Sequence, residues 1–127
     1  ILGICIGMQI FFKKSDEGIK KGFGWLDNEV VRLNSKNTRY PHIGWNNVKM
    51  DEKNSLFKDI NNDSHFYFLH SYGIKKNKKD TFSSYGSTYY GEEFISVIIN
   101  KNLYGVQFHP EKSHSNGVKF LKNFSSI

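Results

Sequence analysis

The sequence contains one cysteine in 127 residues, so it cannot form an internal disulfide bond. Free thiols persist in reducing compartments, and we therefore expect a cytoplasmic protein. No apolar run approaches the roughly 18 residues that a membrane-spanning helix needs, so no membrane span is expected. The five histidines are scattered and, with a single cysteine, give no recognisable metal-ligand spacing. We expect neither a bound metal nor another cofactor.

The formal net charge of +6 comes from lysines spread along the chain, including a dense group at 75–79. Nucleic-acid binding is one interpretation of such a charge. The lysines do not alternate with stacking aromatics, however, and no named nucleic-acid-binding module is present. The better interpretation is a solvated basic surface, and we expect no nucleic-acid partner.

Apolar residues make up 38% of the chain and aromatic residues 16%, which is enough for the core of one domain over residues 1–127. The patterns predict an α/β fold with a mixed sheet, a parallel centre and an antiparallel extension. Loops are expected at 15–24 and 34–40, and a hairpin turn at 100–102. Strands are predicted at 1–4, 29–33, 43–50, 65–70, 81–90, 94–99 and 103–108, and helices or helical turns at 7–13, 55–60 and 117–124.

Two of the predicted helices have apolar residues at helical spacing. In the segment 7–13, the apolar face consists of Met8, Phe11 and Phe12. In the segment 117–124, the residues expected to be buried recur at intervals of three. They are Val118, Leu121 and Phe124.

The single cysteine lies where a short apolar strand gives way to a helix. The local sequence is Gly3-Ile4-Cys5-Ile6-Gly7, and glycines allow the sharp turn that exposes a nucleophile. The backbone N–H of Ile6 is placed to stabilise an oxyanion. A helix N-terminus and a nearby imidazolium would lower the thiol pKa. The alternative is that Cys5 is a small buried hydrophobe.

A second group of polar residues, Gln107 to Ser113, directly follows an apolar strand. It should therefore lie at the C-terminal edge of that strand, where α/β sheets bind ligands. His109 and Glu111 are two residues apart and would point to the same side of an extended chain. The carboxylate could then hold one imidazole nitrogen and leave the other for proton transfer. Alone, a His-Pro-Glu sequence could equally be a surface turn.

The Gly-x-Cys-x-Gly-x-Gln elbow together with Phe-His-Pro-Glu resembles the class I (triad) glutamine amidotransferases. Within that family, the segments 41–48 and 66–72 look like the glutaminase subunits of imidazole glycerol phosphate synthase, an enzyme of histidine biosynthesis. The resemblance extends over essentially the whole chain. It implies a flavodoxin-like glutamine amidotransferase domain.

The resemblance implies a role for each matching residue. Cys5 attacks the glutamine carboxamide, His109 transfers protons, and Glu111 orients His109. Substrate binding falls to Gln9 and to the residues around the elbow and the end of strand 65–70. The implied substrate-binding set is Gln9, Ile6, Gly7, His70, Ser71 and Tyr72.

The resemblance also implies that ammonia passes to a separate (β/α)₈-barrel synthase subunit, so that the two chains form a heterodimer. In such a pair, Trp45, Tyr67 and Lys112 face the partner. For Trp45 the alternative is a core position, for Tyr67 a packed strand residue, and for Lys112 a solvated charge. An exposed tryptophan is well suited to sealing an interface.

The family's N-terminal third has no counterpart in the sequence, which begins without methionine. We expect the chain to be the C-terminal part of a larger domain, and expect residues 1–127 alone to lack glutaminase activity. Three alternatives to a histidine-pathway glutaminase remain: a related ammonia supplier for surface-polysaccharide acetamidino sugars, a stand-alone γ-glutamyl hydrolase, and a non-enzymatic binding module.

Overall fold

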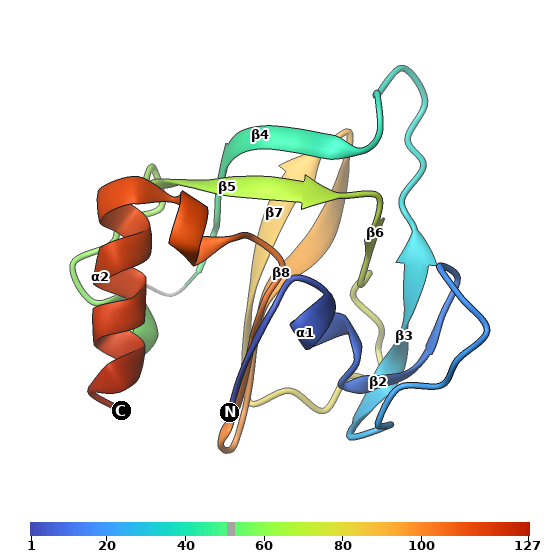
Figure 1. Ribbon diagram of the computed structural model, residues 1–127, viewed down its shortest axis with the longest axis horizontal. Helices are drawn as coiled ribbons and strands as arrows, with labels where there is room; N and C mark the ends of the chain where they lie inside the picture. Colours follow the sequence, from blue (N-terminus) through green and yellow to red (C-terminus); the bar gives the residue numbers. More distant parts are fainter. Residues whose placement is uncertain (51–52) are drawn as a thin grey trace.

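A computed structural model describes residues 1–50 and 53–127 (Figure 1). Two α-helices and two short 3₁₀ helices accompany nine strands in these residues. The elements in chain order are β1 (Leu2–Ile4), α1 (Ile6–Gln9), β2 (Phe12–Ser15), β3 (Leu26–Arg32), β4 (His42–Asn47), η1 (Ser55–Phe57), β5 (His65–His70), β6 (Tyr72–Gly73), β7 (Ser84–Tyr90), β8 (Glu92–Asn100), β9 (Leu103–Val106), η2 (Pro110–Lys112) and α2 (His114–Ser125).

The strands form three sheets. The largest has the order β1-β9-β8-β7, with β1 and β9 parallel and the other pairs antiparallel. A second has the order β2-β3-β6, and β4 pairs with β5 in an antiparallel ribbon across the top of Figure 1. The predicted mixed α/β architecture is therefore confirmed. The parallel pair lies at one end of its sheet, however, and not at the centre as predicted.

A core rich in phenylalanine lies between the large sheet, the β4–β5 ribbon and α2. Phe66 and Phe68 project from β5, and Phe108 and Phe120 meet them from the segment after β9 and from α2. The rings of Phe66 and Phe108 are stacked with centroids 4.2 Å apart. Each fully buried phenylalanine contributes roughly 1.5–3 kcal/mol from removal of its surface from water. This core fixes β5 against the segment that carries His109.

A second core lies under α1. Met8, Phe11 and Phe12 are all buried there, as their spacing predicts, and they pack against Ile95 and Ile98 of β8. The predicted helix at 7–13 is nevertheless wrong in length, because α1 ends at Gln9. From Phe12 the chain forms β2, which pairs in parallel with β3. Strand pairing thus replaces the last helical turns while the same side chains stay buried.

The predicted burial pattern of the C-terminal helix is wrong for Val118 and Leu121, whereas Phe124 is partly buried and packs against the core. α2 begins at His114 and buries Gly117 and Phe120, whereas Val118 is 67% exposed and Leu121 36%. The cause is the close approach of Gly117 to η2: an added Cβ would lie 1.8 Å from the carbonyl oxygen of Pro110. That contact turns the Gly117–Phe120 face of the helix inward.

Most predicted strands are confirmed. β5 matches its prediction residue for residue, and β8 and β9 form the predicted hairpin, with Asn100 opposite Leu103. Strands β2 and β6 were not predicted. β6 has only two residues, Tyr72 and Gly73, which pair with Arg32 and Val31 of β3. A strand this short has too little side-chain pattern to be predicted from sequence.

Candidate active site

Cys5 occupies a strained turn between β1 and α1. Its φ of 52° and ψ of −111° place a non-glycine residue in a sparsely populated region. Its N–H donates to the carbonyl of Val106 at 2.7 Å, which fixes the turn to β9. The neighbouring Gly3 is required, since an added Cβ would lie 2.4 Å from the carbonyl oxygen of Gly7. The predicted strand-to-helix elbow is confirmed.

The sulfur of Cys5 is half-buried and surrounded by hydrogen-bonding groups. The side-chain amide of Gln107 donates to Sγ at 3.5 Å, and the thiol donates to the carbonyl of Leu69 at 3.9 Å. Burial raises the pKa of the Cys5 thiol above its ordinary value, and the carboxylates of Glu17 and Glu111 raise it further. The N–H groups of Ile6 and Gln107 act in the opposite direction. The predicted lowering of the thiol pKa is therefore wrong, because burial outweighs the N–H groups.

His109 and Glu111 form a close pair. The imidazole Nδ1 and the carboxylate Oε1 are 2.6 Å apart, which leaves Nε2 available for proton transfer. His109 itself is extended, as expected before proline. The segment Pro110–Lys112 is a 3₁₀ helix and not the extended chain assumed from the sequence. The predicted contact therefore exists, but a tight turn creates it.

The His109 segment is attached to the middle of β5 through one residue of that strand. The N–H of His109 donates to the carbonyl of Tyr67 at 2.8 Å. The N–H of Tyr67 donates to Oγ of Ser113 at 2.9 Å, and this hydroxyl donates in turn to the carbonyl of His109 at 2.6 Å. Ser113 is buried. These bonds hold the imidazole in a position set by β5.

The cysteine and the histidine lie at the same edge of the large sheet. Cys5 follows β1, His109 follows β9, and these strands are parallel with Ile4 opposite Val106. Within the described residues, the imidazole of His109 is not among the hydrogen-bond partners of the sulfur, which are Gln107 and Leu69. Catalytic hydrogen bonds often tighten only when substrate is bound. The structure thus brings the thiol to the edge where the imidazole–carboxylate pair lies.

A pocket of about 240 Å³ lies beside α1. Ile6 and Gln9, both expected to bind substrate, are among its lining residues, as are Glu17, Lys20 and Lys21. Gly7, also expected there, has open space where a Cβ would project. The pocket carries both signs of charge, and neither Cys5 nor His109 is among its lining residues.

The remaining expected substrate residues belong to a buried polar network next to the pocket. Nδ1–H of His70 and the side-chain N–H₂ of Gln9 both donate to the carbonyl of Tyr72, at 2.9 and 3.0 Å. The carbonyl of Ser71 accepts the N–H of Leu33. None of the residues 70–72 lines the pocket beside α1.

His42 extends this network, although no pattern in the sequence pointed to it. Its Nδ1 lies 3.1 Å from Nε2 of His70, and both rings are buried. Burial lowers the pKa of His42 to about 3, and the adjacent His70 adds to that effect. Burial also lowers the pKa of His70 to about 4. Both histidines are therefore neutral at physiological pH.

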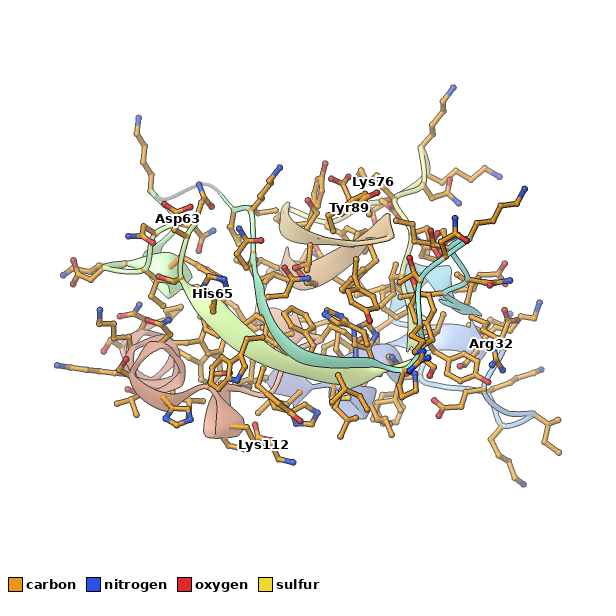
Figure 2. All side chains as sticks on the ribbon, turned by 90° about the horizontal axis from the view of Figure 1, so that it is seen from above. Arg32, Asp63, His65, Lys76, Tyr89 and Lys112 are labelled. Atoms are coloured by element: carbon orange, nitrogen blue, oxygen red, sulfur yellow. The ribbon has the colours of Figure 1, made fainter. Side chains whose placement is uncertain are left out.

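The residues expected to face a partner lie together on the outer surface of the β4–β5 ribbon. Trp45 is opposite Tyr67 in the ribbon and the two rings are 5.8 Å apart. The ammonium of Lys112 lies 5.9 Å from the Tyr67 ring, and Figure 2 shows Lys112 at the periphery of the molecule near β5. Trp45 is 48% exposed, and its neighbours Ile43 and Leu69 are exposed as well, so a core position for Trp45 is excluded.

Comparison with known proteins identifies the family. The family model described as "Glutamine amidotransferase class-I" matches residues 1–126. The chain belongs to this family. Imidazole glycerol phosphate synthase subunits HisH from Bdellovibrio bacteriovorus and Buchnera aphidicola are 45% and 46% identical to it over its whole length. The chain spans 63% of the length of each of these relatives.

Solved structures confirm the glutamine amidotransferase fold. A putative GMP synthase protein from Thermoplasma acidophilum superimposes with a TM-score of 0.66 at 22% identity, covering 99% of this chain and 55% of that one. A glutamine amidotransferase from Thermotoga maritima gives 0.59 at 19% identity, covering 98% of this chain and 46% of that one. At these identities the likeness concerns the fold alone.

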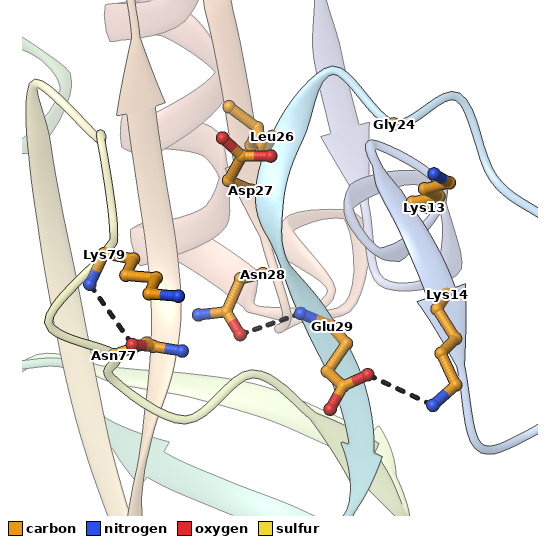
Figure 3. A pocket seen from close by; sticks show the side chains of 9 residues that line it. All are labelled: Lys13, Lys14, Gly24, Leu26, Asp27, Asn28, Glu29, Asn77 and Lys79. Carbon is orange, nitrogen blue, oxygen red and sulfur yellow. Dashed lines mark hydrogen bonds and ion pairs between the residues drawn. The ribbon is translucent and has the colours of Figure 1, made fainter.

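A second pocket, of about 450 Å³, has neither Cys5 nor His109 among its lining residues (Figure 3). It is formed by β2, β3 and the loop that carries Asn77 and Lys79. An ion pair of 3.4 Å between Lys14 and Glu29 lies on its wall. Both of these side chains are largely exposed, so the pair contributes little to stability.

Two further properties bear on the expectations from sequence. In residues 1–50 and 53–127, no group of three or more histidine, cysteine, aspartate or glutamate side chains is arranged to hold a metal ion. Across the same residues, none of the helices has the length and apolar character needed to span a bilayer.

Sequence reasoning missed Glu17, Gln107 and His42. Gln107 immediately precedes the Phe-His-Pro-Glu motif at the end of an apolar strand, and a polar residue at that position could have been predicted to lie near the site. Glu17 lies in a loop whose path cannot be read from its pattern. His42 lies in the segment 41–48 that carries the family resemblance, but it was given no role of its own, and alternation along β4 places it on the opposite face from Trp45.

Proposed function

We propose that this chain carries the glutaminase site of imidazole glycerol phosphate synthase. It hydrolyses glutamine to glutamate and ammonia, and passes ammonia to a (β/α)₈-barrel synthase subunit in histidine biosynthesis. The observation that carries the proposal is the pairing of β1 with β9, which brings Cys5 to the sheet edge that holds the His109–Glu111 pair. The 45% identity to a HisH subunit over the whole chain supports this assignment.

The chemistry follows from the groups at this edge. The Cys5 thiol loses its proton to the imidazole of His109, and the sulfur attacks the carboxamide carbon of glutamine. The backbone N–H of Ile6 stabilises the oxyanion. His109 returns the proton to the amide nitrogen, which leaves as ammonia, and then removes a proton from the water that hydrolyses the thioester. Glu111 accepts the Nδ1–H of His109 and keeps Nε2 directed to these steps.

The pocket beside α1 suits a zwitterionic amino acid. Glu17 provides a negative charge for the α-ammonium group, and Lys20 and Lys21 provide positive charge for the α-carboxylate. Gln9 and Ile6 line the same pocket. Gly7 leaves room for the substrate at the start of α1. Tyr72, whose carbonyl accepts from the side chain of Gln9 and from His70, orients Gln9 toward the substrate, and Ser71 connects His70 to Tyr72.

The exposed face of the β4–β5 ribbon is the proposed partner surface. Trp45 and Tyr67 form its aromatic centre, and Lys112 adds a positive charge at its margin. Ammonia protonates in bulk water, so an apolar seal between source and consumer is needed. A large exposed aromatic pair is suited to that role. A cytoplasmic location fits the proposal, because the free thiol of Cys5 must stay reduced.

The proposal is tested with the protein as encoded in its genome, co-expressed with the barrel subunit of the same organism. Glutamate release and imidazole glycerol phosphate formation are measured for the wild type and for Cys5→Ala, His109→Asn and Glu111→Gln. We expect Cys5→Ala and His109→Asn to abolish both activities and Glu111→Gln to lower them strongly. A Ser83→Ala variant, changed at a surface loop, serves as the matched control.

Three outcomes contradict the proposal in different ways. Vigorous glutamine hydrolysis without any barrel partner supports a stand-alone hydrolase. A folded protein whose Cys5 is inert toward a glutamine-mimicking electrophile, with or without the partner, supports a binding module. Glutamate release with ammonia transfer only to an amidino-sugar synthase supports the surface-polysaccharide alternative.

A further inference from the structure

The amide side chain of Gln107 is completely buried and lies against the sulfur of Cys5. Its nitrogen is 3.5 Å from Sγ, and its oxygen accepts from Nε2 of Gln9 at 2.9 Å. A glutamine amide has one accepting end and one donating end. Because the oxygen is bound to Gln9, the end that faces the sulfur is the donor.

The orientation of Gln9 is fixed in turn by a backbone group. Its Nε2 donates both to Gln107 and to the carbonyl oxygen of Tyr72. A carbonyl oxygen can only accept, so the amide of Gln9 cannot be reversed without facing two oxygens. His70 donates to the same carbonyl through Nδ1. The Tyr72 carbonyl therefore fixes the orientation of the Gln9 amide, and the Gln9 amide fixes the orientation of the Gln107 amide.

The Tyr72 carbonyl also determines the tautomers of His70 and His42. Nδ1 of His70 carries the proton that the Tyr72 carbonyl accepts, so Nε2 of His70 accepts from Nδ1–H of His42. Nε2 of His42 is then the acceptor for the side-chain amide of Asn46 at 3.4 Å. Every step has one donor and one acceptor, which buried polar networks need in order to be stable.

We propose that Gln107 is a positioning residue that holds the Cys5 sulfur by donating a side-chain N–H to it, with the Tyr72 carbonyl fixing that polarity through Gln9. The inference deepens the proposed function, and it rests on that function in treating Cys5 as the nucleophile. A donor at the sulfur stabilises the thiolate over the thiol. Glu17 and Glu111 are the carboxylates that act on the same sulfur, and both oppose ionisation. Gln107 therefore offsets part of the cost of forming a thiolate in a buried, acidic setting.

The test uses the pH dependence of Cys5 alkylation by iodoacetamide in the protein as encoded. Gln107→Glu keeps the shape of the side chain but offers an acceptor to the sulfur, and Gln107→Met removes the donor at similar length. We expect the alkylation rate at about pH 8 to fall about tenfold in both variants, since loss of a hydrogen bond to a charged group has about this size. The midpoint of the pH profile should rise by about one unit, with the high-pH plateau unchanged.

Thr88→Val is the matched control, because Thr88 is also buried and hydrogen-bonded, with its hydroxyl donating to Ser96. A purely structural role for Gln107 would lower the melting temperature in all three variants and leave the alkylation midpoint in place. An unchanged midpoint in a folded Gln107→Met protein overturns the proposal.

A measurement on the wild type covers the case in which the Gln107 variants do not fold. The side-chain amide resonances of Gln107 in a ¹⁵N-labelled protein should shift with the titration of the Cys5 thiol, and this shift should vanish in Cys5→Ser. Amide resonances that stay constant through the titration overturn the proposal. Alkylation by iodoacetamide requires neither glutamine nor a partner. If the Gln107 variants shift the alkylation midpoint but the protein has no glutaminase activity, only the proposed function is refuted.

Discussion

Acidification should destabilise the protein through the buried pair His42 and His70. Both pKa values are lowered in the folded state, to about 3 and about 4, from an ordinary value of 6.5. The unfolded chain therefore binds protons at these rings between pH 6.5 and about 4, where the folded chain does not. Unfolding takes up protons in that window, so the stability present above pH 6.5 is lost as the pH falls toward the folded pKa values.

The loss of stability at pH 5 depends little on the pKa values in the folded state, because both rings are still neutral in the folded protein at that pH. At this pH each unfolded histidine is about 1.5 pH units below its own pKa, which corresponds to about 2 kcal/mol per ring. The pair then accounts for about 4 kcal/mol of lost stability between neutral pH and pH 5. This is a large part of the 5–15 kcal/mol by which domains are typically stable.

Urea denaturation at half-unit steps from about pH 4.5 to pH 7.5 measures this effect. With both rings present, the free energy of unfolding should change by about 2.7 kcal/mol per pH unit in the steep region. In His42→Asn one titrating group is lost, and the slope should fall to about half of that. His70 stays buried in that variant, so its contribution persists.

His65→Asn is the control, because His65 is exposed and loses little hydration on folding. Equal slopes for the wild type and His42→Asn would refute the reasoning. So would a slope reduction of the same size in His65→Asn, since the effect would then be unrelated to burial.

Three further predictions concern the core, the C-terminal helix and the exposed aromatic surface. Phe66→Ala should cost about 3–5 kcal/mol in urea denaturation, while Val118→Ala, at an exposed helix position, should stay within about 0.5 kcal/mol. Gly117→Ala should lower the melting temperature because the added Cβ would collide with Pro110, even though alanine favours a helix over glycine by about 1 kcal/mol. An unchanged or raised melting temperature would contradict this close contact. Trp45→Ala should weaken binding of the proposed barrel subunit in calorimetric titration by about 2 kcal/mol or more with little change in melting temperature, and unaltered affinity would contradict the proposal that Trp45 lies in the interface.

Much of the fold could be predicted because its strongest elements have clear local patterns. β5 alternates buried and exposed residues over its full length, and the β8–β9 hairpin has a polar turn between two apolar strands. The ends of α1 and the face of α2 could not be predicted in this way. Phe12 satisfies a helical spacing and a strand position equally well, and only the pairing of β2 with β3 decides between them. The inward face of α2 depends on a contact between Gly117 and Pro110, which periodicity does not contain.

The candidate site shows the same division. Cys5, His109 and Glu111 stand in local motifs, and the turn geometry at Cys5 and the His109–Glu111 contact follow from short-range sequence. The surroundings of the sulfur do not, since Glu17 and Gln107 reach it from other parts of the chain. Expecting a low thiol pKa from the helix N-terminus was wrong because burial raises the pKa of Cys5, and burial is a property of the assembled fold.

The attachment of His109 to Tyr67 has a mechanical consequence. The backbone of this one β5 residue bonds the segment that bears the imidazole, while its ring lies beside Trp45 on the outside. The backbone of Cys5 is held to the end of β9 by its bond to Val106, while its thiol donates to the carbonyl of Leu69 in β5. The outer ribbon is thus the shared support of both side chains: a displacement of β5 would be transmitted to the His109 segment through Tyr67 and to the Cys5 sulfur through Leu69.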